Sequence, residues 1–268
     1  MISTPNSLYT AVVLAADRGP GDPVAGVAGV PCKSLVPVGK IPMVVRVLDA
    51  LTAANEIGTC ILCGPAKSIV DEHAELSARI SSGKIRWFQN QATPSTSTYH
   101  VLRSLPDDAL VLVTTADHAL LGSHIVDYFC SEARKTGCDI VAGLAMHETV
   151  VAAYPGTRRT ATKLRDGAYC SCNLFAFLTP GGREVADFWR QIENQRKKPL
   201  RVISVLGWIA VLRYLLGRLS LAEAQKRISR RLGLRAGAIV LPYPEAAIDV
   251  DTVSDWKFVQ TLVAKQTS

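Results

Sequence analysis

The chain has 268 residues, of which 48% are hydrophobic and 20% charged, and its formal net charge at pH 7 is +7. This composition excludes a disordered chain and leaves room for one large α/β domain or two small ones. The opening sequence MISTPNSLYT has neither a basic segment nor a long apolar run, so we expect no export signal and a cytoplasmic location.

The first half of the chain alternates strand-like and helix-like segments. The run ALVLVT is apolar throughout, which is typical of a parallel strand buried on both faces. Elsewhere apolar residues recur with a helical period, as at Val44, Val47, Leu48 and Leu51. In chain order the predicted elements are the strand Tyr9–Ala15, the helix Met43–Ala54, the strand Thr59–Cys63, the helix Ser68–Ile80, the strand Ile85–Phe88, the helix Ser97–Ser104, the strand Ala109–Thr114, the helix Gly122–Thr136 and the strand Asp139–Leu144.

The second half is less regular. A loop-rich stretch is expected first, and Ser254 is expected to cap the last helix. In chain order the segments are the loop-rich His147–Ala168, the strand Asn173–Leu178, the helix Arg183–Gln195, the strands Ala238–Leu241 and Ala247–Val250, and the helix Ser254–Lys265. With no internal repeat or low-complexity linker, residues 1–268 predict a single doubly wound α/β domain. We expect a mostly parallel central sheet flanked by helices, with a basic helical insertion at about 183–236.

The positive charge is concentrated late in the chain. Residues 190–235 hold twelve Lys or Arg against two acids, a net charge of +10 that leaves −3 for the remainder. The simpler interpretation of this charge is a basic surface layer. The more specific one is a contact surface for an anionic partner. Within it, Val202–Leu221 is mostly apolar, but glycines and arginines interrupt it well before the ~20 residues that a membrane span needs. We expect a buried or membrane-surface helix pair there.

Several common site types are excluded. The sequence contains no G-x-x-x-x-G-K-[ST] phosphate loop, no G-x-G-x-x-G after the first strand, no G-x-S-x-G and no H-E-x-x-H. Its seven cysteines are an odd number. Cys60 and Cys63 have the spacing of a redox or zinc half-site, but they lie in an apolar run and no second pair has suitable spacing, so we expect buried structural thiols.

Residues 11–51 instead carry a signal for phosphate. They begin with an apolar strand, continue into a Gly- and Pro-rich loop, and bring Lys33 ahead of a second apolar segment. A strand that ends in flexible backbone beside a fixed positive charge is suited to holding phosphate.

These segments also carry a resemblance. VVLAA is followed by the glycine-containing loop, by KSLVPVG at 33–39 and by PMVVRVL at 42–48. TTADHALL at 114–121 and AIDVDTVSDW at 247–256 follow in the same order, with NLFAF at 173–177 as a weaker match. Together they resemble the MobA-like NTP transferases and sugar-phosphate nucleotidyltransferases of GT-A type fold.

The resemblance implies a magnesium-dependent transfer of a nucleoside monophosphate unit. Both reactants are anions, so the protein must neutralise and align them. Asp117 and Asp251 would hold Mg²⁺ (or Mn²⁺), while Lys33 and Arg18 would contact the triphosphate as catalytic residues. From the residues alone, Asp117 could equally cap the helix that begins near Gly122, and Asp251 competes with its neighbour Asp249 for the metal role.

The resemblance also assigns binding residues. The end of the first strand and its loop would cradle the nucleotide, and polar residues after the third strand would read the base and ribose. Asn173 matches a position that contacts the acceptor. The implied nucleotide-binding residues are Leu14, Ala15, Ala16, Asp17, Gly19, Gly21, Gln91 and Ser95.

One departure from the family pattern concerns the first loop. Where the family has Leu-Ala-Ala-Gly, this chain has Asp17, which lacks glycine's backbone freedom and adds negative charge. Three interpretations are open: the loop takes a different path, Asp17 faces the metal, or nucleotide binding is weakened. In addition, Ala119 stands where the family has proline.

The resulting hypothesis is a nucleotidyltransferase that joins a nucleoside monophosphate unit to a phosphorylated small molecule and releases pyrophosphate. Its partners would be a nucleoside triphosphate and the acceptor, with no nucleic acid expected, and the base and the oligomeric state are left open. Two alternatives remain: a GT-A glycosyltransferase, whose Asp-x-Asp would have to be Asp249-Val250-Asp251, and a catalytically silent nucleotide-binding or interaction domain.

Overall fold

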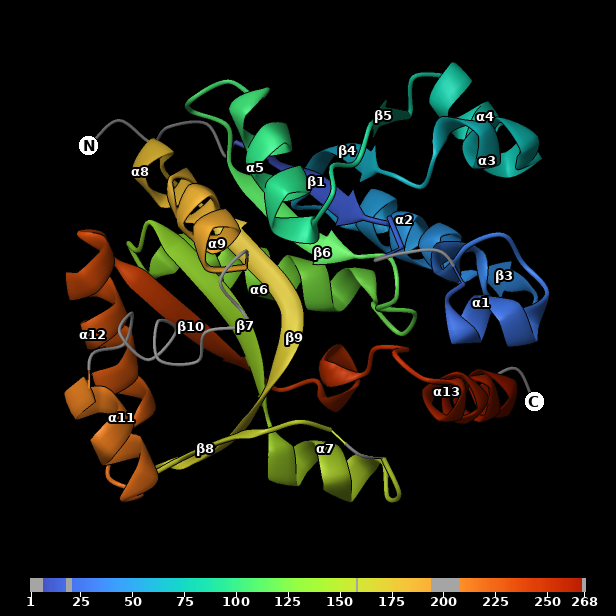
Figure 1. The fold of residues 1–268 in the computed structure, drawn as a ribbon. Coiled ribbons are helices and arrows are strands. Elements are labelled where there is room, and N and C mark those ends of the chain that lie inside the picture. The colour runs from blue at the N-terminus through green and yellow to red at the C-terminus, as the bar shows by residue number, and fades with distance from the viewer. Residues whose placement is uncertain (1–6, 18–20, 158, 194–207, 267–268) are drawn as a thin grey trace.

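The computed structural model describes residues 7–17, 21–157, 159–193 and 208–266 (Figure 1). Within these residues the centre of the fold is an eight-stranded sheet with the order β10-β7-β9-β6-β1-β4-β5, and β8 pairs with β9. The strands are β1 (Tyr9–Leu14), β4 (Ile57–Cys63), β5 (Ile85–Phe88), β6 (Val111–Thr115), β7 (Ile140–Met146), β8 (Thr162–Leu164), β9 (Gly167–Phe177) and β10 (Ala236–Leu241). A separate hairpin joins β2 (Pro37–Val38) to β3 (Ile41–Pro42).

The sheet is mostly parallel. β1 runs parallel to both β4 and β6, β4 runs parallel to β5, and β7 runs parallel to β10. The long strand β9 lies antiparallel between β6 and β7, and β8 is antiparallel to β9. The predicted fold class, a mostly parallel central sheet flanked by helices, is therefore confirmed.

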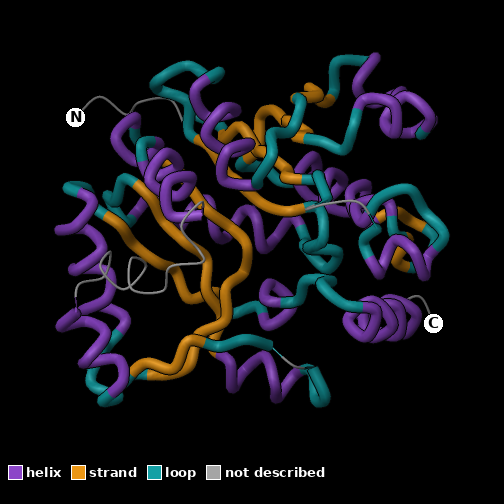
Figure 2. The backbone as a smooth tube through the Cα atoms, viewed as in Figure 1, coloured by secondary structure: helices purple, strands orange, loops and turns teal. Residues whose placement is uncertain are grey.

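Helices cover both faces of the sheet, as Figures 1 and 2 show. Alternate residues of β1 point to opposite faces, so Ala11 and Val13 pack into one core and Val12 into the other. The first core contains the apolar sides of α2 (Met43–Ala53) and α6 (Ser123–Lys135), and the second contains residues of α5 (Pro94–Arg103) and α9 (Val185–Glu193). The remaining helices are α1 (Pro23–Ala28), η1 (Lys33–Leu35), α3 (Lys67–Glu72), α4 (Ala74–Ser81), α7 (His147–Ala153), α8 (Pro180–Arg183), α11 (Trp208–Leu215), α12 (Leu221–Leu232), η2 (Pro244–Ala247) and α13 (Val253–Gln266).

The register between β1 and β6 determines where the loops emerge. Leu14 pairs with Thr115 at the carboxyl ends of both strands, and the Ala116 amide donates to the Leu14 carbonyl at 3.0 Å. The segments after these two strands, which carry Asp17 and Asp117, therefore leave the sheet side by side. Open α/β sheets bind ligands at this edge.

The final helix fixes the hairpin that follows η1. Trp256 of α13 donates its indole N–H to the Pro37 carbonyl at 2.7 Å, and Gln260 donates to the same carbonyl at 3.0 Å. The Gly39 amide in turn donates to the side chain of Gln260 at 2.7 Å. The start of α13 and the segment after Lys33 are therefore held together by hydrogen bonds.

The first half of the chain differs from its prediction mainly at short elements. The Gly- and Pro-rich loop contains α1, whose first amides are capped by the Asp22 carboxylate, as well as η1 and the β2–β3 hairpin. The predicted helix at 68–80 is two helices, because His73 leaves the helical conformation and its ring accepts from the Leu76 amide. Helix α5 starts at Pro94, three residues before the predicted start, and Thr93 caps it.

Three expectations for the second half are wrong. The stretch 147–168 is not mainly loop, since it contains α7, with Val150 buried on one side, and the β8 strand. Residues 247–250 form no strand, because Pro244 begins the 3₁₀ turn η2 and the chain leaves the sheet there. The last helix begins at Val253, and the Thr252 hydroxyl, not Ser254, accepts from the Asp255 amide.

The basic region is described only in part. Helices α8 and α9 cover the start of the predicted insertion, and α11 and α12 cover its end, whereas residues 194–207 lie outside the described residues. The apolar stretch 202–221 thus corresponds to α11 and the first residue of α12 where it is described. Among the described helices none has the length and apolar character to cross a membrane.

Candidate active site

Three segments that are distant in sequence meet at the carboxyl edge of the sheet. Lys33 begins η1, Asp117 follows β6, and Asp251 precedes α13. The Lys33 Nζ atom lies 2.7 Å from Asp117 Oδ2 and 2.9 Å from Asp251 Oδ1. The Val250 amide donates to the Asp117 carbonyl at 3.1 Å, which fixes the two acidic segments relative to each other. The structure therefore brings together three of the four residues that the resemblance assigned to phosphate and metal, and the fourth, Arg18, lies outside the described residues.

The two carboxylates keep Lys33 charged. Burial disfavours the ammonium form, but the charge of Asp117 and the hydrogen bonds to Asp117 and Asp251 outweigh it, so the pKa of Lys33 is raised. The exposed fractions of the side chains are 17% for Lys33, 20% for Asp117 and 59% for Asp251, so the cluster opens to solvent on the Asp251 side. A fixed cation at the mouth of a cleft is suited to a polyphosphate.

Asp17 connects the end of β1 to the segment that carries Lys33. Both of its carboxylate oxygens accept from the Lys33 amide, at 3.0 and 3.2 Å. Burial raises the pKa of Asp17, and the hydrogen bond from the Lys33 amide partly offsets this rise. The Asp17 carboxylate is therefore turned toward the backbone of Lys33, where it orients η1.

Asn173 lies beside this cluster through Asp249. Its side-chain amide donates to Asp249 Oδ2 at 2.9 Å, and its backbone has a φ of 50°, which is unusual for a residue other than glycine. Burial raises the pKa of Asp249, and the negative charges of Asp117 and Asp251 raise it further. Asn173 is therefore next to the acidic cluster, where an acceptor would approach.

Arg159 is a site residue that the sequence did not reveal. Its guanidinium is hydrogen-bonded to the Asp249 carboxylate, donates to the Asp249 carbonyl at 2.8 Å, and contacts Asp255 at 3.1 Å. The side chain is only 8% exposed, so it neutralises Asp249, the first carboxylate of the Asp249-Val250-Asp251 sequence, from inside the protein. It lies in the stretch predicted as loop, and no local pattern distinguishes it from a surface arginine.

The residues present fit a divalent cation. A single nitrogen lies within 2.9 Å of both Asp117 and Asp251, so the two carboxylates are close enough to share one ion. The second oxygen of Asp117 is buried and accepts no hydrogen bond from the described residues. Mg²⁺ is commonly held by one or two carboxylates together with phosphate oxygens and water. No cluster of three or more His, Cys, Asp or Glu suited to a metal occurs in the described part of the chain, so the protein would supply these two carboxylates.

Some of the residues that the resemblance assigned to nucleotide binding lie together. Leu14, Ala16, Asp17 and Gln91 line one small cleft together with Cys63, Ala92, Thr93, Pro94 and Ser97. The Gln91 amide donates to the Ser97 hydroxyl at 2.8 Å, which ties the segment after β5 to α5.

The other predicted nucleotide residues that the structure describes do not line this cleft. Ala15 is buried and donates its amide to the Cys63 carbonyl, and Ser95 is buried in the first turn of α5, 3.1 Å from the Thr93 hydroxyl. Gly21 has a φ of 81° and precedes the cap of α1. Arg18 and Gly19 lie outside the described residues.

A match to known proteins covers the part of this site that includes Lys33, Asp117 and Arg159, whereas Asn173, Asp249 and Asp251 lie beyond it. Residues 11–166, more than half of the chain, match the family model of the MobA-like NTP transferase domain. The chain belongs to this family. The enzyme class that goes with it is nucleotidyltransferase, as the sequence predicted.

Solved structures resemble this MobA-like transferase over nearly its whole length. A hypothetical transferase from Thermus thermophilus is 31% identical to it, with a TM-score of 0.77, and the alignment covers 93% of this chain and 99% of that one. The 4-diphosphocytidyl-2C-methyl-D-erythritol synthase of Anaerococcus prevotii has a TM-score of 0.55 at 14% identity, covering 97% of each chain. CMP:2-keto-3-deoxy-manno-octonic acid synthetase complexed with CTP has a TM-score of 0.56 at 12% identity, covering 96% and 99%. The last two structures, at these low identities, show that the fold of this chain is shared with them. No curated protein is significantly similar in sequence.

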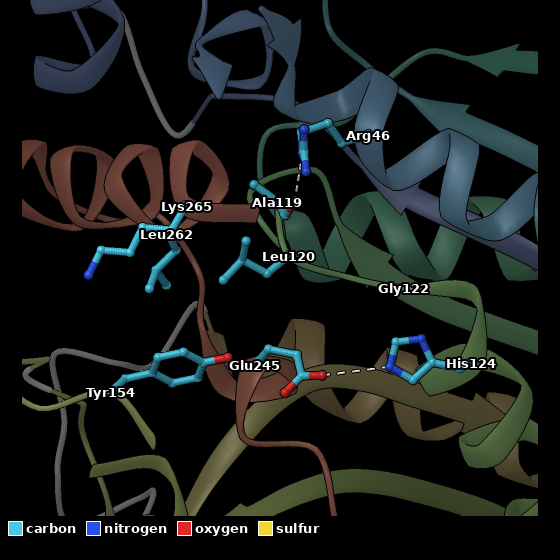
Figure 3. Close-up of a pocket in the computed structure, with 9 residues that line it drawn as sticks. All are labelled: Arg46, Ala119, Leu120, Gly122, His124, Tyr154, Glu245, Leu262 and Lys265. Carbon is cyan, nitrogen blue, oxygen red and sulfur yellow. Dashed lines mark hydrogen bonds and ion pairs between the residues drawn. The ribbon is translucent and has the colours of Figure 1, made fainter. Parts of the chain in front are cut away.

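A second cavity of this MobA-like transferase lies beside the loop that follows Asp117. It has a volume of about 450 Å³ and contains none of the predicted site residues (Figure 3). Arg46 of α2 donates from Nε to the Ala119 carbonyl at 3.0 Å and so braces the loop two residues after Asp117. The cavity is lined by Arg46, Ala119, Leu120, Gly122, His124, Tyr154, Glu245, Leu262 and Lys265.

Proposed function

We propose that this MobA-like transferase transfers a nucleoside monophosphate unit from a nucleoside triphosphate to a phosphorylated small molecule, with a divalent cation held by Asp117 and Asp251. The observation that carries the proposal is that Asp117 and Asp251 both lie within 2.9 Å of the Lys33 Nζ atom. Two anionic reactants repel each other, so their approach requires positive charge. Here a fixed ammonium group and a cation shared by two carboxylates would supply it.

The reaction exchanges one phosphorus–oxygen bond for another. An oxygen of the acceptor's phosphate attacks the α-phosphorus, the bond from that phosphorus to the β-phosphate oxygen breaks, and pyrophosphate leaves. No residue has to form a covalent bond, so the side chains act by position and charge. A bound Mg²⁺ would supply positive charge for the phosphate oxygens.

The described residues have separable tasks in this proposal. Lys33 neutralises the triphosphate, and Asp17 fixes the backbone from which Lys33 projects. The small cleft between the end of β1 and the start of α5, about 20 Å³ in volume, contains Gln91 and marks the side on which the base or ribose would bind. Asn173 and Arg159 hold Asp249 next to the metal ligand Asp251, on the side from which the acceptor would approach.

The glycosyltransferase alternative has less support. Such an enzyme would use both carboxylates of Asp249-Val250-Asp251, but Asp249 is already occupied by Arg159 and Asn173. Only Asp251 of the pair contacts Lys33.

A screen of pyrophosphate release tests the proposal. The protein is incubated with each of the four nucleoside triphosphates, Mg²⁺ and a panel of sugar and alditol phosphates. We expect pyrophosphate release that depends on the acceptor, is removed by EDTA and is abolished in Asp117→Asn, with the circular dichroism spectrum unchanged. Undiminished turnover in Asp117→Asn would refute the assigned metal site. Binding of a triphosphate without turnover with any acceptor would favour the silent nucleotide-binding alternative, and failure of all four triphosphates to bind would refute the proposal.

A further inference from the structure

One end of the molecule exposes an unusual run of apolar side chains. Leu212, Tyr214, Leu215 and Leu216, in α11 and just after it, are 47%, 41%, 74% and 58% exposed. Leu215 is the most exposed large apolar side chain of the described residues, and the other exposed ones are far apart from one another in the sequence. A group of this kind on a water-soluble surface indicates a contact surface.

An apolar cavity continues this surface inward. It has a volume of about 370 Å³ and lies between the sheet and the two helices α11 and α12. Tyr214 and Arg227 both line it, so the exposed run on α11 and the basic helix α12 border the same hollow. Its other lining residues are Leu144, Thr162, Leu164, Tyr169, Ser171, Leu219, Leu221, Ala224 and Ile228.

The same end of the molecule is strongly basic. Residues 208–235 contain seven arginines or lysines and one acid, a net charge of +6. Arg213 is paired with Glu223 and Arg235 with Asp139. The other five cations take part in none of the ion pairs between described residues; they are Arg218, Lys226, Arg227, Arg230 and Arg231.

Helix α12 carries four of these cations, of which Lys226, Arg230 and Arg231 are exposed. None of its residues is fully buried, and Leu221, Ala224 and Ile228 turn toward the cavity. Lys226 and Arg230 are exposed and four residues apart, so they lie on one side of the helix.

This surface is remote from the candidate active site. Helix α12 packs against β10, the strand at one end of the sheet, while Lys33 and Asp117 lie beside β1 and β6. In Figure 1, α11 and α12 form the left edge of the molecule, and α13, which follows Asp251, lies on the right. A partner bound at α11 and α12 would leave the active-site cleft open.

We propose that the face made by α11 and α12 docks the protein onto the surface of an anionic lipid bilayer. Exposed leucines beside a tyrosine, with arginines and lysines alongside, are the composition of a helix that lies in the headgroup region. A second copy of the chain fits less well, because a symmetric contact would bring two faces of charge +6 together. A nucleic acid would satisfy the charges but leave the leucines in water.

Vesicle binding by the full chain tests this proposal. The probes are vesicles of phosphatidylcholine alone and of phosphatidylcholine with about 30% phosphatidylglycerol, at low salt and at about 0.5 M salt. We expect the protein to co-sediment with the anionic vesicles only, and high salt to weaken this binding by about tenfold or more. Two double variants, Arg230→Gln with Arg231→Gln and Leu215→Ser with Leu216→Ser, should each lower the partition coefficient by about tenfold or more.

Matched controls separate surface docking from a general charge effect. Lys84→Gln with Arg86→Gln removes two charges at β5, the opposite end of the sheet, and Val151→Ser removes an exposed apolar side chain on α7. These controls should bind as the unaltered protein does, and all variants should keep their circular dichroism spectra.

Three results would overturn the proposal: no binding to anionic vesicles, equal binding to neutral vesicles, or an equal loss in the controls. A dimer that dissociates in the Leu215/Leu216 variant, without vesicle binding by the unaltered protein, would instead identify an interface between copies. Pyrophosphate release in the absence of vesicles should be the same in all these variants, so the test stands apart from the proposed reaction.

Discussion

Lys33 occupies the position where both carboxylates of the site converge. Replacing it with alanine removes the charge that faces a bound triphosphate while leaving Asp117 and Asp251 in place. We expect Lys33→Ala to lower the rate of pyrophosphate release about 10²- to 10³-fold, the usual effect of losing one group that stabilises developing charge. Lys40→Ala, which removes an exposed lysine seven residues later, should have little effect. Equal losses in the two variants would contradict a specific role for Lys33.

Asp17 has the opposite effect from the one its charge suggests, because it stabilises the loop instead of repelling the substrate. Asp17→Ala leaves the Lys33 amide without its acceptor, which costs roughly 1 kcal/mol of stability at a half-buried position. We expect lower kcat in Asp17→Ala and near-normal kcat in Asp17→Asn, whose side-chain oxygen still accepts. Steady-state kinetics and urea unfolding measure the two effects. Faster turnover in Asp17→Ala would show that the carboxylate hinders phosphate binding.

Arg159 compensates a carboxylate that is otherwise costly to bury. Arg159→Met would leave Asp249 facing Asp117 and Asp251 without its partner. We expect a loss of about 2–3 kcal/mol in unfolding free energy, less than the ~3–5 kcal/mol for a fully buried pair, because the Asp249 side chain is 24% exposed. Adding Asp249→Asn should recover part of the loss in urea unfolding. Strictly additive effects of the two substitutions would contradict a direct interaction.

At the scale of elements, α2 positions the loop that carries Asp117. Arg46 is the contact: burial lowers its pKa, and its guanidinium donates to the Ala119 carbonyl. Arg46→Met should leave the fold intact and lower kcat by about tenfold, because a small displacement of a metal ligand is sufficient for such a loss. The KM for the triphosphate should change less than kcat, and Asp49→Asn on the same helix is the control. A change in KM alone would assign Arg46 to substrate binding.

The elements that the sequence predicted are those whose signal is local. The buried strands β1 and β6 and the amphipathic helix α2 were predicted with small errors at their ends, because burial of both faces of a strand leaves a continuous apolar run and burial of one face of a helix leaves a helical period. Elements of two to six residues, such as η1 and the β2–β3 hairpin, are too short for a period. Residues 247–250 look like a strand because three of the four are apolar, but these three, Ala247, Ile248 and Val250, are buried in the core outside the sheet.

The site residues likewise divide into those that the sequence predicted and those that it did not. Lys33, Asp117 and Asp251 were predicted to lie together because each lies in a recognisable segment. The role of Asp17 and the presence of Arg159 were not found, because their partners are 16, 90 and 96 residues away. Contacts at that separation follow from the assembled sheet and not from any local pattern.

At the scale of the whole molecule, a buried histidine next to the site makes stability depend on pH. His118 is 1% exposed, and burial lowers its pKa to about 4 from an ordinary 6.5, although the neighbouring Asp117 carboxylate acts in the opposite direction. Between these two values the unfolded chain binds a proton that the folded chain excludes. The contribution of His118 to the free energy of unfolding is fully present above pH 6.5. It is lost as the pH falls toward 4, by roughly 3 kcal/mol in total.

Urea unfolding at a series of pH values from about 7 to about 4 measures this dependence in the unaltered protein and in His118→Gln. The variant should be less stable at neutral pH, because its amide replaces a well-packed ring, but its stability should fall less steeply with acid. Asp17 and Asp249, whose pKa values are raised, act in the opposite sense and are common to both proteins, so the difference between the two curves isolates His118. Parallel curves would contradict this account, because they would mean that folding does not change the pKa of His118.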